Sequence, residues 1–151
     1  MSKTIQCSAL VSHTPQQMFD LVNDVEAYPS YMGGCAGAKV LKRDDNSITA
    51  RLDLEKAGLR QSFTTRNILR APNSITMELV EGPFRKLQGL WQFKPMANGG
   101  CQIEFRLEYE FANFLLGLAA GKLMAQLVNE QVDAVCRRAQ SLYGSQSSGR
   151  Q

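Results

Sequence analysis

The sequence predicts an α+β fold in which a curved antiparallel sheet wraps around one long C-terminal helix. Three observations predict it. Residues 38–111 show strand-like alternation interrupted by turn residues, residues 113–143 form one long amphipathic segment, and a short helical segment follows a first strand at the N-terminus. Successive hairpins build a strongly twisted sheet. We therefore expect six to seven strands with the long helix across the concave face.

The chain begins with a strand and two short helices. Residues 4–12 alternate, with Ile5 and Val11 on the same face. The segment 14–17 (TPQQ) combines a threonine cap, a proline at the first helical position and a glutamine that closes a capping box, so a helix is predicted to about Asn23. A second short helix is predicted at 25–28, and Pro29 ends it.

The middle of the chain is predicted to be all strands and turns. The strands are expected at 38–43, 47–55, 59–70, 75–80, 87–94 and 101–111. Asp44-Asp45-Asn46, Gly58, the segment 71–74 (APNS), Gly82-Pro83 and Asn98-Gly99-Gly100 separate them. The last strand alternates most regularly, with apolar residues from Cys101 to Phe111 on one face and Glu104, Glu108 and Glu110 on the other. One face is therefore predicted to be buried and the other solvated.

The long C-terminal segment is predicted to be one helix with a wide apolar face. Its polar side carries Lys122, Gln126, Asn129, Glu130, Asp133, Arg137 and Gln140. Its apolar side carries Leu116, Ala120, Leu123, Met124, Leu127, Val128, Val132, Val135, Ala139 and Leu142. This arc covers roughly half of the circumference, whereas a surface helix needs only about 100°. Such a helix must lie in a concave surface, which the sheet supplies.

Length and composition predict a single domain, residues 1–143, followed by a disordered polar tail, residues 144–151. The net charge of +3 permits an anionic partner without requiring one. The N-terminus lacks the basic and apolar regions of a signal peptide, so we expect an intracellular protein. The four cysteines and the single histidine, His13, lack the spacing of a metal site. The cysteines are interpreted as structural and His13 as a loop histidine.

Three stretches of the sequence resemble a known family. They are residues 22–29 (VNDVEAYP) with Cys35 after them, residues 63–67 (FTTRN), and residues 82–87 (GPFRKL) leading to Trp91-Gln92-Phe93. Together with the order of elements, they resemble the coenzyme Q-binding protein and RatA (ribosome association toxin) family of START-like domains, also called SRPBCC or polyketide cyclase-like. The resemblance covers residues 3–143 and implies the helix-grip fold.

The resemblance implies three functions. The first is non-enzymatic binding of a ubiquinone-like polyprenyl quinone, or a similar lipid, in a cavity between sheet and helix, which would support respiration or quinone delivery. The second is translation inhibition by a RatA-type toxin that binds the large ribosomal subunit, with or without an antitoxin partner. The third is a polyketide cyclase-like enzyme. We favour the first as the main prediction.

The predicted ligand-binding residues face the space between sheet and helix. The apolar ones are Phe63, Leu79, Phe84, Trp91, Phe93, Phe105, Leu107 and Tyr109 from the sheet region and Leu116, Ala120, Leu123 and Leu127 from the helix. Thr65, Asn67 and Gln131 are polar residues at inward positions. A buried amide needs a partner, since leaving it unpaired costs about 1–3 kcal/mol, and a quinone carbonyl would supply one. The alternatives are a solid core and bonds to neighbouring backbone.

The segment 113–121 (NFLLGLAAG) is apolar nearly all round, and Tyr28, Tyr31, Met32 and Phe84 are predicted to lie in loops beside it. With Arg85, Lys86 and Lys122 nearby, this end is predicted either to dock on the inner face of the cytoplasmic membrane or to form a dimer interface. Otherwise the protein is expected in the cytoplasm.

Residues suited to catalysis are few. His13 has no evident serine or cysteine partner, and the glutamates of the last strand point outward. A cyclase would need an acid or base in the pocket, for which Tyr109, Glu78 and Lys56 are the candidates. We therefore expect no enzymatic activity.

A basic stripe is the candidate contact for ribosomal RNA. Arg60, Arg66 and Arg70 share one face of a strand, and Arg51 has the same outward parity on its neighbour. Lys39, Lys42 and Arg43 are close in sequence. The stripe is predicted either to bind phosphates or to be an ordinary solvated face.

Overall fold

The computed structural model describes residues 2–144, in which seven strands form one antiparallel sheet in the order β1-β7-β6-β5-β4-β3-β2. The strands are β1 (Lys3–Val11), β2 (Cys35–Arg43), β3 (Ser47–Lys56), β4 (Leu59–Arg70), β5 (Ser74–Glu81), β6 (Phe84–Pro95) and β7 (Cys101–Phe111). The predicted sheet of six to seven strands is confirmed.

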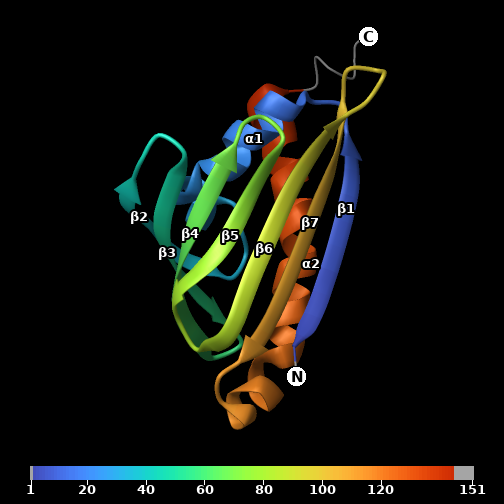
Figure 1. Cartoon of the computed structure of the whole chain (residues 1–151). Coiled ribbons are helices and arrows are strands. Elements are labelled where there is room, and N and C mark those ends of the chain that lie inside the picture. Colours follow the sequence, from blue (N-terminus) through green and yellow to red (C-terminus); the bar gives the residue numbers. More distant parts are fainter. Residues whose placement is uncertain (1, 145–151) are drawn as a thin grey trace.

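The long helix α2 (Phe114–Tyr143) lies across the concave face of this sheet, as predicted. Figure 1 shows α2 behind the sheet, running along β7 and β1 with its first turns at the lower end of the molecule. Asn113 caps the helix, because its side chain accepts hydrogen bonds from the backbone amides of Leu115 and Leu116 at 2.8 and 3.1 Å. Most of the predicted apolar side is buried, from Ala120 to Ala139.

The short helices α1 (Pro15–Asn23) and η1 (Val25–Ser30) close the upper end of the sheet. The capping box of Thr14 and Gln17 forms as predicted. The second helix is a 3₁₀-helix and extends to Ser30, two residues beyond the predicted end. The hydroxyl of Tyr28 donates to the carbonyl of Val22 and ties the two helices together.

The sheet bends where its register shifts, in β2, at the β4–β5 pairing and at the start of β6. Strand β2 begins at Cys35, three residues before the predicted start, because the residues after η1 enter the sheet directly. The predicted tail lies outside the described residues except for Gly144. None of the helices in residues 2–144 combines the length and hydropathy that crossing a bilayer requires.

Candidate functional site

A cavity lies between the concave face of the sheet and α2. Strands β3 to β7 supply most of its wall, α1 and η1 close one side, and α2 closes the other. It is lined by Val22, Val25, Tyr28, Ala50, Leu52, Leu54, Phe63, Thr65, Asn67, Ile75, Met77, Leu87, Trp91, Phe105, Leu107, Met124, Leu127, Val128 and Gln131. The wall is therefore mainly aliphatic and aromatic, as ligand pockets usually are.

The free space in this cavity is small. Its volume is about 50 Å³, whereas pockets for drug-sized ligands span about 300–1,000 Å³. A second void of about 40 Å³ lies beside it towards the β3–β4 turn, and the two share Leu54, Phe63, Met124 and Leu127 as walls. Both voids are thus too small for a lipid in this conformation, and a lipid-sized ligand would have to displace the side chains between them.

Two buried polar side chains of β4 face the cavity. Thr65 and Asn67 are only 2% and 9% exposed, and the Thr65 hydroxyl donates to the Asn67 side-chain oxygen at 2.9 Å. That bond fixes the amide, so that its nitrogen is left to donate to a further acceptor. Gln131 of α2 lines the same cavity. The arrangement can bind a carbonyl-type oxygen from two sides.

Charged groups do not line this cavity among the described residues. Its wall holds no Asp, Glu, Lys, Arg or His side chain. Tyr28 is the one phenol there, and burial raises its pKa well above the usual value while its hydroxyl stays bonded to Val22. The wall therefore suits a neutral ligand better than an ionised one, because a charge there would be unpaired.

The structure brings eight of the fifteen predicted binding residues to this cavity. They are Phe63, Thr65, Asn67, Trp91, Phe105, Leu107, Leu127 and Gln131. Phe84, Ala120 and Leu123 line the second void, and Tyr109 lines a groove near the start of α2. Leu79, Phe93 and Leu116 line none of these spaces; Phe93 is 1% exposed and stacks on Trp91 as part of the solid core.

Sequence reasoning missed part of the wall. Ala50, Leu52 and Leu54 of β3 line the cavity, and their alternation with polar residues in the sequence is a signal that could have found them. Val22 and Tyr28 also line it, because α1 and η1 fold over the end of the sheet. That contact is between distant elements and has no local signal.

An ion pair between sheet and helix lies beside the second void. The Lys56 ammonium at the end of β3 lies 2.8 Å from the Glu130 carboxylate of α2, and Lys56 also lines the void. Hydrogen bonding from Lys56 lowers the pKa of Glu130, and Gln126 donates to the same carboxylate at 3.3 Å. Within residues 2–144 this is the one ion pair that joins the sheet to α2.

A larger groove opens at the first turns of α2. It has a volume of about 430 Å³. Its lining is Lys3, Arg85, Tyr109, Glu110, Phe111, Ala112, Asn113, Phe114, Gly117, Leu118 and Gly121. Phe111 also lines the second void, so one aromatic ring separates groove and void. The groove is open to solvent, as the second void also is, and it is much larger than either void.

The predicted exposure of four loop residues beside the start of α2 is largely wrong, and so is the predicted position of Tyr31, which lies beside Arg138 in the last turns of α2. Tyr28, Met32 and Phe84 are 9%, 4% and 7% exposed, because η1 and the start of β6 pack against the core. Phe84 stacks on Phe111 with ring centroids 4.9 Å apart. Tyr31 is half-buried and lies under the Arg138 guanidinium, which is 5.1 Å from its ring.

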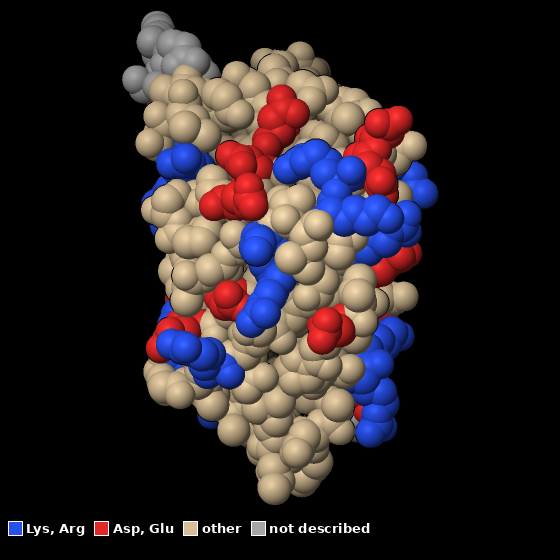
Figure 2. All heavy atoms as spheres, turned by 90° about the vertical axis from the view of Figure 1, so that its left-hand side faces the viewer, with Lys and Arg blue, Asp and Glu red and all other residues tan. Residues whose placement is uncertain are grey.

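The outer face of the sheet divides into two halves with different charge pairing. On β6 and β7, Lys86 pairs with Glu108 at 3.1 Å and Lys94 with Glu104 at 2.8 Å. On β2 to β4, three arginines have acidic partners: Arg51 with Asp53, Arg60 with Glu55 and Arg66 with Glu78, at 2.9, 3.0 and 3.9 Å. Figure 2 shows basic and acidic side chains mixed over the β2 side of the molecule.

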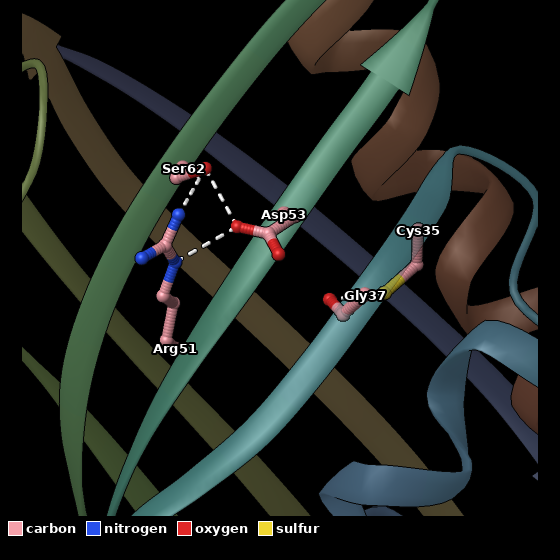
Figure 3. Close-up of polar contacts among 5 residues, drawn as sticks. All are labelled: Cys35, Gly37, Arg51, Asp53 and Ser62. Atoms are coloured by element: carbon pink, nitrogen blue, oxygen red, sulfur yellow. Dashed lines mark hydrogen bonds and ion pairs between the residues drawn. The ribbon is translucent and has the colours of Figure 1, made fainter.

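Arg51 is held by the network in Figure 3. Its guanidinium bonds the Asp53 carboxylate at 2.9 Å and the Ser62 hydroxyl at 3.3 Å, and Ser62 donates to the same carboxylate at 2.6 Å. These bonds lower the pKa of Asp53. Nearby, the Cys35 thiol donates to the Gly37 carbonyl, and burial raises its pKa. Cys35 is therefore a poor nucleophile.

The β2–β4 half retains a surplus of positive charge. Lys39, Lys42, Arg43 and Arg70 form no ion pair within the described residues. Lys39 lies directly opposite Arg51 in the β2–β3 register, and like charges in that position are destabilising. We call Lys39, Lys42, Arg51 and Arg66 the basic cluster; Lys42 and Arg66 both lie opposite Thr49 in the next row.

Other chemistry is sparse in the described part of the chain. No three His, Cys, Asp or Glu side chains there lie close enough to share a metal ion. His13, predicted as a loop histidine, does lie in a loop but is only 4% exposed and packs against Tyr143 at 5.6 Å between ring centroids. Cys101 and Cys35 are buried free thiols.

The sequence of residues 11–136 matches the family described as polyketide cyclase / dehydrase and lipid transport. The ribosome association toxin RatA of Escherichia coli (strain K12) is 43% identical over 141 residues, which are 93% of this chain and 89% of that protein. The chain belongs to this family, in its RatA-like branch. The resemblance predicted from three short stretches is thus confirmed.

More distant relatives agree with the fold. The mitochondrial coenzyme Q-binding protein COQ10 homolog B of Xenopus laevis is 24% identical over 143 residues, 92% of this chain and 59% of that protein. A START superfamily protein from Mycobacterium smegmatis superposes with a TM-score of 0.78 at 23% identity, covering 92% of this chain and 98% of that one. The helix-grip fold is confirmed.

These identities reorder the predicted functions. The RatA relative shares 43% of aligned residues and the coenzyme Q-binding relative only 24%. The RatA-like alternative is therefore better supported than the quinone-binding function that we favoured from sequence. Membership of a family described by lipid transport agrees with the mainly apolar wall of the cavity. It leaves the ligand unspecified.

Proposed function

We propose that this RatA-like protein associates with the large ribosomal subunit and inhibits translation, using the basic cluster on the outer face of β2 to β4. The 43% identity to a ribosome association toxin over 93% of the chain carries the proposal. That likeness extends over the sheet as well as the helix, so it includes the outer strands that would contact the ribosome. No catalysis is required for such a function.

The basic cluster fits a phosphate backbone. Lys39 lies opposite Arg51 across β2 and β3, and within the described residues it forms no ion pair of its own. An anion bound between the two cations would relieve their repulsion. Arg66 is about half exposed and only weakly paired, at 3.9 Å from Glu78. Contacts of this kind to RNA phosphates are electrostatic and salt-dependent. The absence of aromatic side chains among the cluster favours backbone contact over base stacking.

Co-sedimentation with purified large subunits at several salt concentrations tests the proposal. The variant Lys39→Ala/Lys42→Ala/Arg66→Ala should bind more weakly, and its dependence of log K on log salt should flatten by roughly one for each lost phosphate contact. Arg106→Ala is the matched control, because Arg106 is an exposed arginine on the outer face of β7. An in vitro translation assay should show the same order of inhibition.

Two results would contradict this function. The first is wild-type protein that fails to sediment with subunits at low salt. The second is a triple variant that binds and inhibits as the wild type does. Loss of binding by Arg106→Ala alone would move the contact to the other half of the sheet.

A second function is favoured by the polar pair in the cavity. We infer that the cavity binds a neutral apolar ligand with a carbonyl oxygen, of which a ubiquinone-like polyprenyl quinone is one example. Thr65 orients Asn67 towards the cavity, and the wall carries no charge that would pair with an ionised headgroup. Displacing Met124, Leu127 and Phe63 would join the two voids and make room for the ligand.

Organic extraction of mildly purified protein, followed by mass spectrometry, tests this second function. A quinone or another carbonyl-bearing lipid is expected in the extract. Thr65→Val/Asn67→Leu should reduce its occupancy, and Gln131→Leu should do so to a smaller degree if the helix supplies a second donor. Met77→Leu, which changes the same wall without a polar group, is the control. An empty wild-type cavity would reject the inference.

A further inference from the structure

The most exposed large apolar side chains of the described residues lie together at the start of α2. Phe114, Leu115 and Leu118 are 77%, 71% and 68% exposed. We call these three residues the apolar tip. Leu10 is the next most exposed, at 67%, and it stands alone on β1. Single exposed leucines are ordinary, whereas a contiguous group marks a contact surface.

The apolar tip is free of charge and flanked by basic residues. Residues 112–121 contain no ionisable side chain, and Figure 2 shows no charged side chain at the lower end of the molecule, where Figure 1 places the start of α2. Lys3, Arg85 and Lys122 are exposed around it. Arg85 lies 3.4 Å from Glu110, whose own side chain is 22% exposed, so the guanidinium is the outer member of that pair.

The groove behind the tip is mostly apolar, with Lys3 and Arg85 among its lining residues. Gly117 and Gly121 keep it open, because these positions of α2 carry no side chain; a Cβ added at Gly121 would meet no atom within 4 Å. A volume of about 430 Å³ accommodates part of an acyl chain. Apolar tip, open groove and basic rim therefore face the same side.

We propose that this end of the molecule docks on an anionic lipid bilayer. The apolar tip inserts below the headgroups, the groove takes an acyl chain, and Lys3, Arg85 and Lys122 contact lipid phosphates. Interfacial binding of this kind combines buried apolar area with attraction to anionic lipids. The proposal goes beyond ribosome association, since it depends on exposed apolar side chains on a different part of the surface.

A second copy of the chain fits this surface less well than a bilayer does. The tip consists of three side chains on the first turns of α2, which lie at the lower end of the molecule in Figure 1, whereas a stable protein interface buries about 800 Å² on each partner. A two-fold dimer through the tip would also place the same basic rim against itself. A bilayer surface instead offers depth for the tip and negative charge for the rim.

Vesicle co-sedimentation of the full chain tests docking. Phosphatidylcholine vesicles with phosphatidylglycerol should bind the protein, and pure phosphatidylcholine vesicles should bind it several-fold more weakly. Phe114→Ser/Leu118→Ser should weaken binding to the mixed vesicles by about tenfold or more, because two inserted side chains are lost. Leu10→Ser is the matched control, with similar exposure at a distant position, and should bind as the wild type.

Three outcomes would overturn the proposal. They are no binding of the wild type to either vesicle, a tip variant that binds like Leu10→Ser, and a change in oligomer mass on ultracentrifugation caused by the tip variant alone. If the double variant unfolds, Leu118→Ser replaces it, and circular dichroism verifies its fold. Ribosome binding should be unaffected by the tip variants, so failure of this proposal is distinguishable from failure of the proposed function.

Discussion

The two ends of α2 are built for different purposes. From Leu127 to Ala139 the inward residues are buried, and Val135 and Ala139 are fully inaccessible. From Phe114 to Gly121 only Ala120 is buried, while the three side chains of the apolar tip project into solvent. One continuous helix therefore carries a core-forming part and a contact-forming part.

Side-chain bonds show the same division. At the far end the Tyr143 hydroxyl donates to the Gln17 carbonyl at 3.0 Å, and midway the Cys7 thiol donates to the Asn129 side-chain oxygen at 2.8 Å. In the first turns the side-chain bonds are those of the Asn113 cap. The fold should therefore tolerate substitutions at the start of α2 that it cannot tolerate in the middle.

The same substitution should destabilise the protein strongly at one place and hardly at all at the other. Leu127→Ala should lower the free energy of unfolding by about 2–5 kcal/mol, because it empties buried space between α2 and the sheet. Leu118→Ala should change it by less than about 0.5 kcal/mol, because Leu118 is 68% exposed. Urea denaturation of both variants measures the difference.

A comparable loss in both variants would mean that the apolar tip is packed in solution and that the two parts of α2 do not differ. Binding to anionic vesicles should follow the reverse order, with Leu118→Ala weakened and Leu127→Ala unaffected at temperatures where it remains folded.

Replacing the two glycines in the first turns of α2 with alanine should stabilise that end of the helix. Gly117→Ala and Gly121→Ala should each raise the free energy of unfolding by about 0.5–1 kcal/mol, because glycine inside a helix is costly. Neither position is crowded, since a Cβ at Gly117 would lie 3.7 Å from Phe111. Thermal melts measure the gain, and a loss of stability would show that the glycines are needed for packing.

Features fixed by neighbouring residues were predictable from the sequence. The helix 113–143 was placed within one residue, with Asn113 now seen as its cap. The capping box at Thr14 and the hairpin after Pro95 also formed where their residue types require it. The inward parity of Thr65 and Asn67 followed from strand alternation, and both are buried.

Features that depend on distant contacts were not predictable. Tyr28, Met32 and Phe84 seemed to be loop residues because nothing in their local sequence signals burial, and η1 and β6 pack them into the core. The small volume of the cavity depends on how Met124 and Leu127 fill it. The Lys56–Glu130 pair joins residues 74 positions apart. Such facts require the register of the whole sheet.

The buried His13, which packs against Tyr143 at the C-terminal end of α2, should make stability sensitive to mild acid. Burial of His13 lowers its pKa below the usual 6.5, so the unfolded chain binds a proton more readily than the folded one. Stability is then complete above pH 6.5 and falls as the pH drops through the folded-state pKa. Urea midpoints at pH 7.5 and 5.5 measure the loss, and His13→Phe should remove most of it.

His13 is the single histidine of the chain, so we attribute the loss of stability between pH 7.5 and 5.5 mainly to this residue. The lowered pKa of Asp53 shifts its own contribution to more acidic pH. An equal slope for wild type and His13→Phe between pH 7.5 and 5.5 would contradict the assignment.

The smallest change in stability that we expect comes from removing the ion pair between β3 and the core-forming part of α2. Lys56→Met breaks the bond to Glu130 and should leave the unfolding midpoint nearly unchanged, because exposed pairs contribute little. It should nevertheless speed uptake of an uncharged fluorescent lipid probe several-fold, since the pair links β3 to α2 beside the void next to the cavity and restrains their separation. Lys94→Met is the matched control, because Lys94 pairs with Glu104 at the same 2.8 Å on the outer face. Stopped-flow traces that coincide for wild type and both variants would mean that ligands pass elsewhere, and the groove behind the apolar tip would then be the next route to block, by Gly121→Leu.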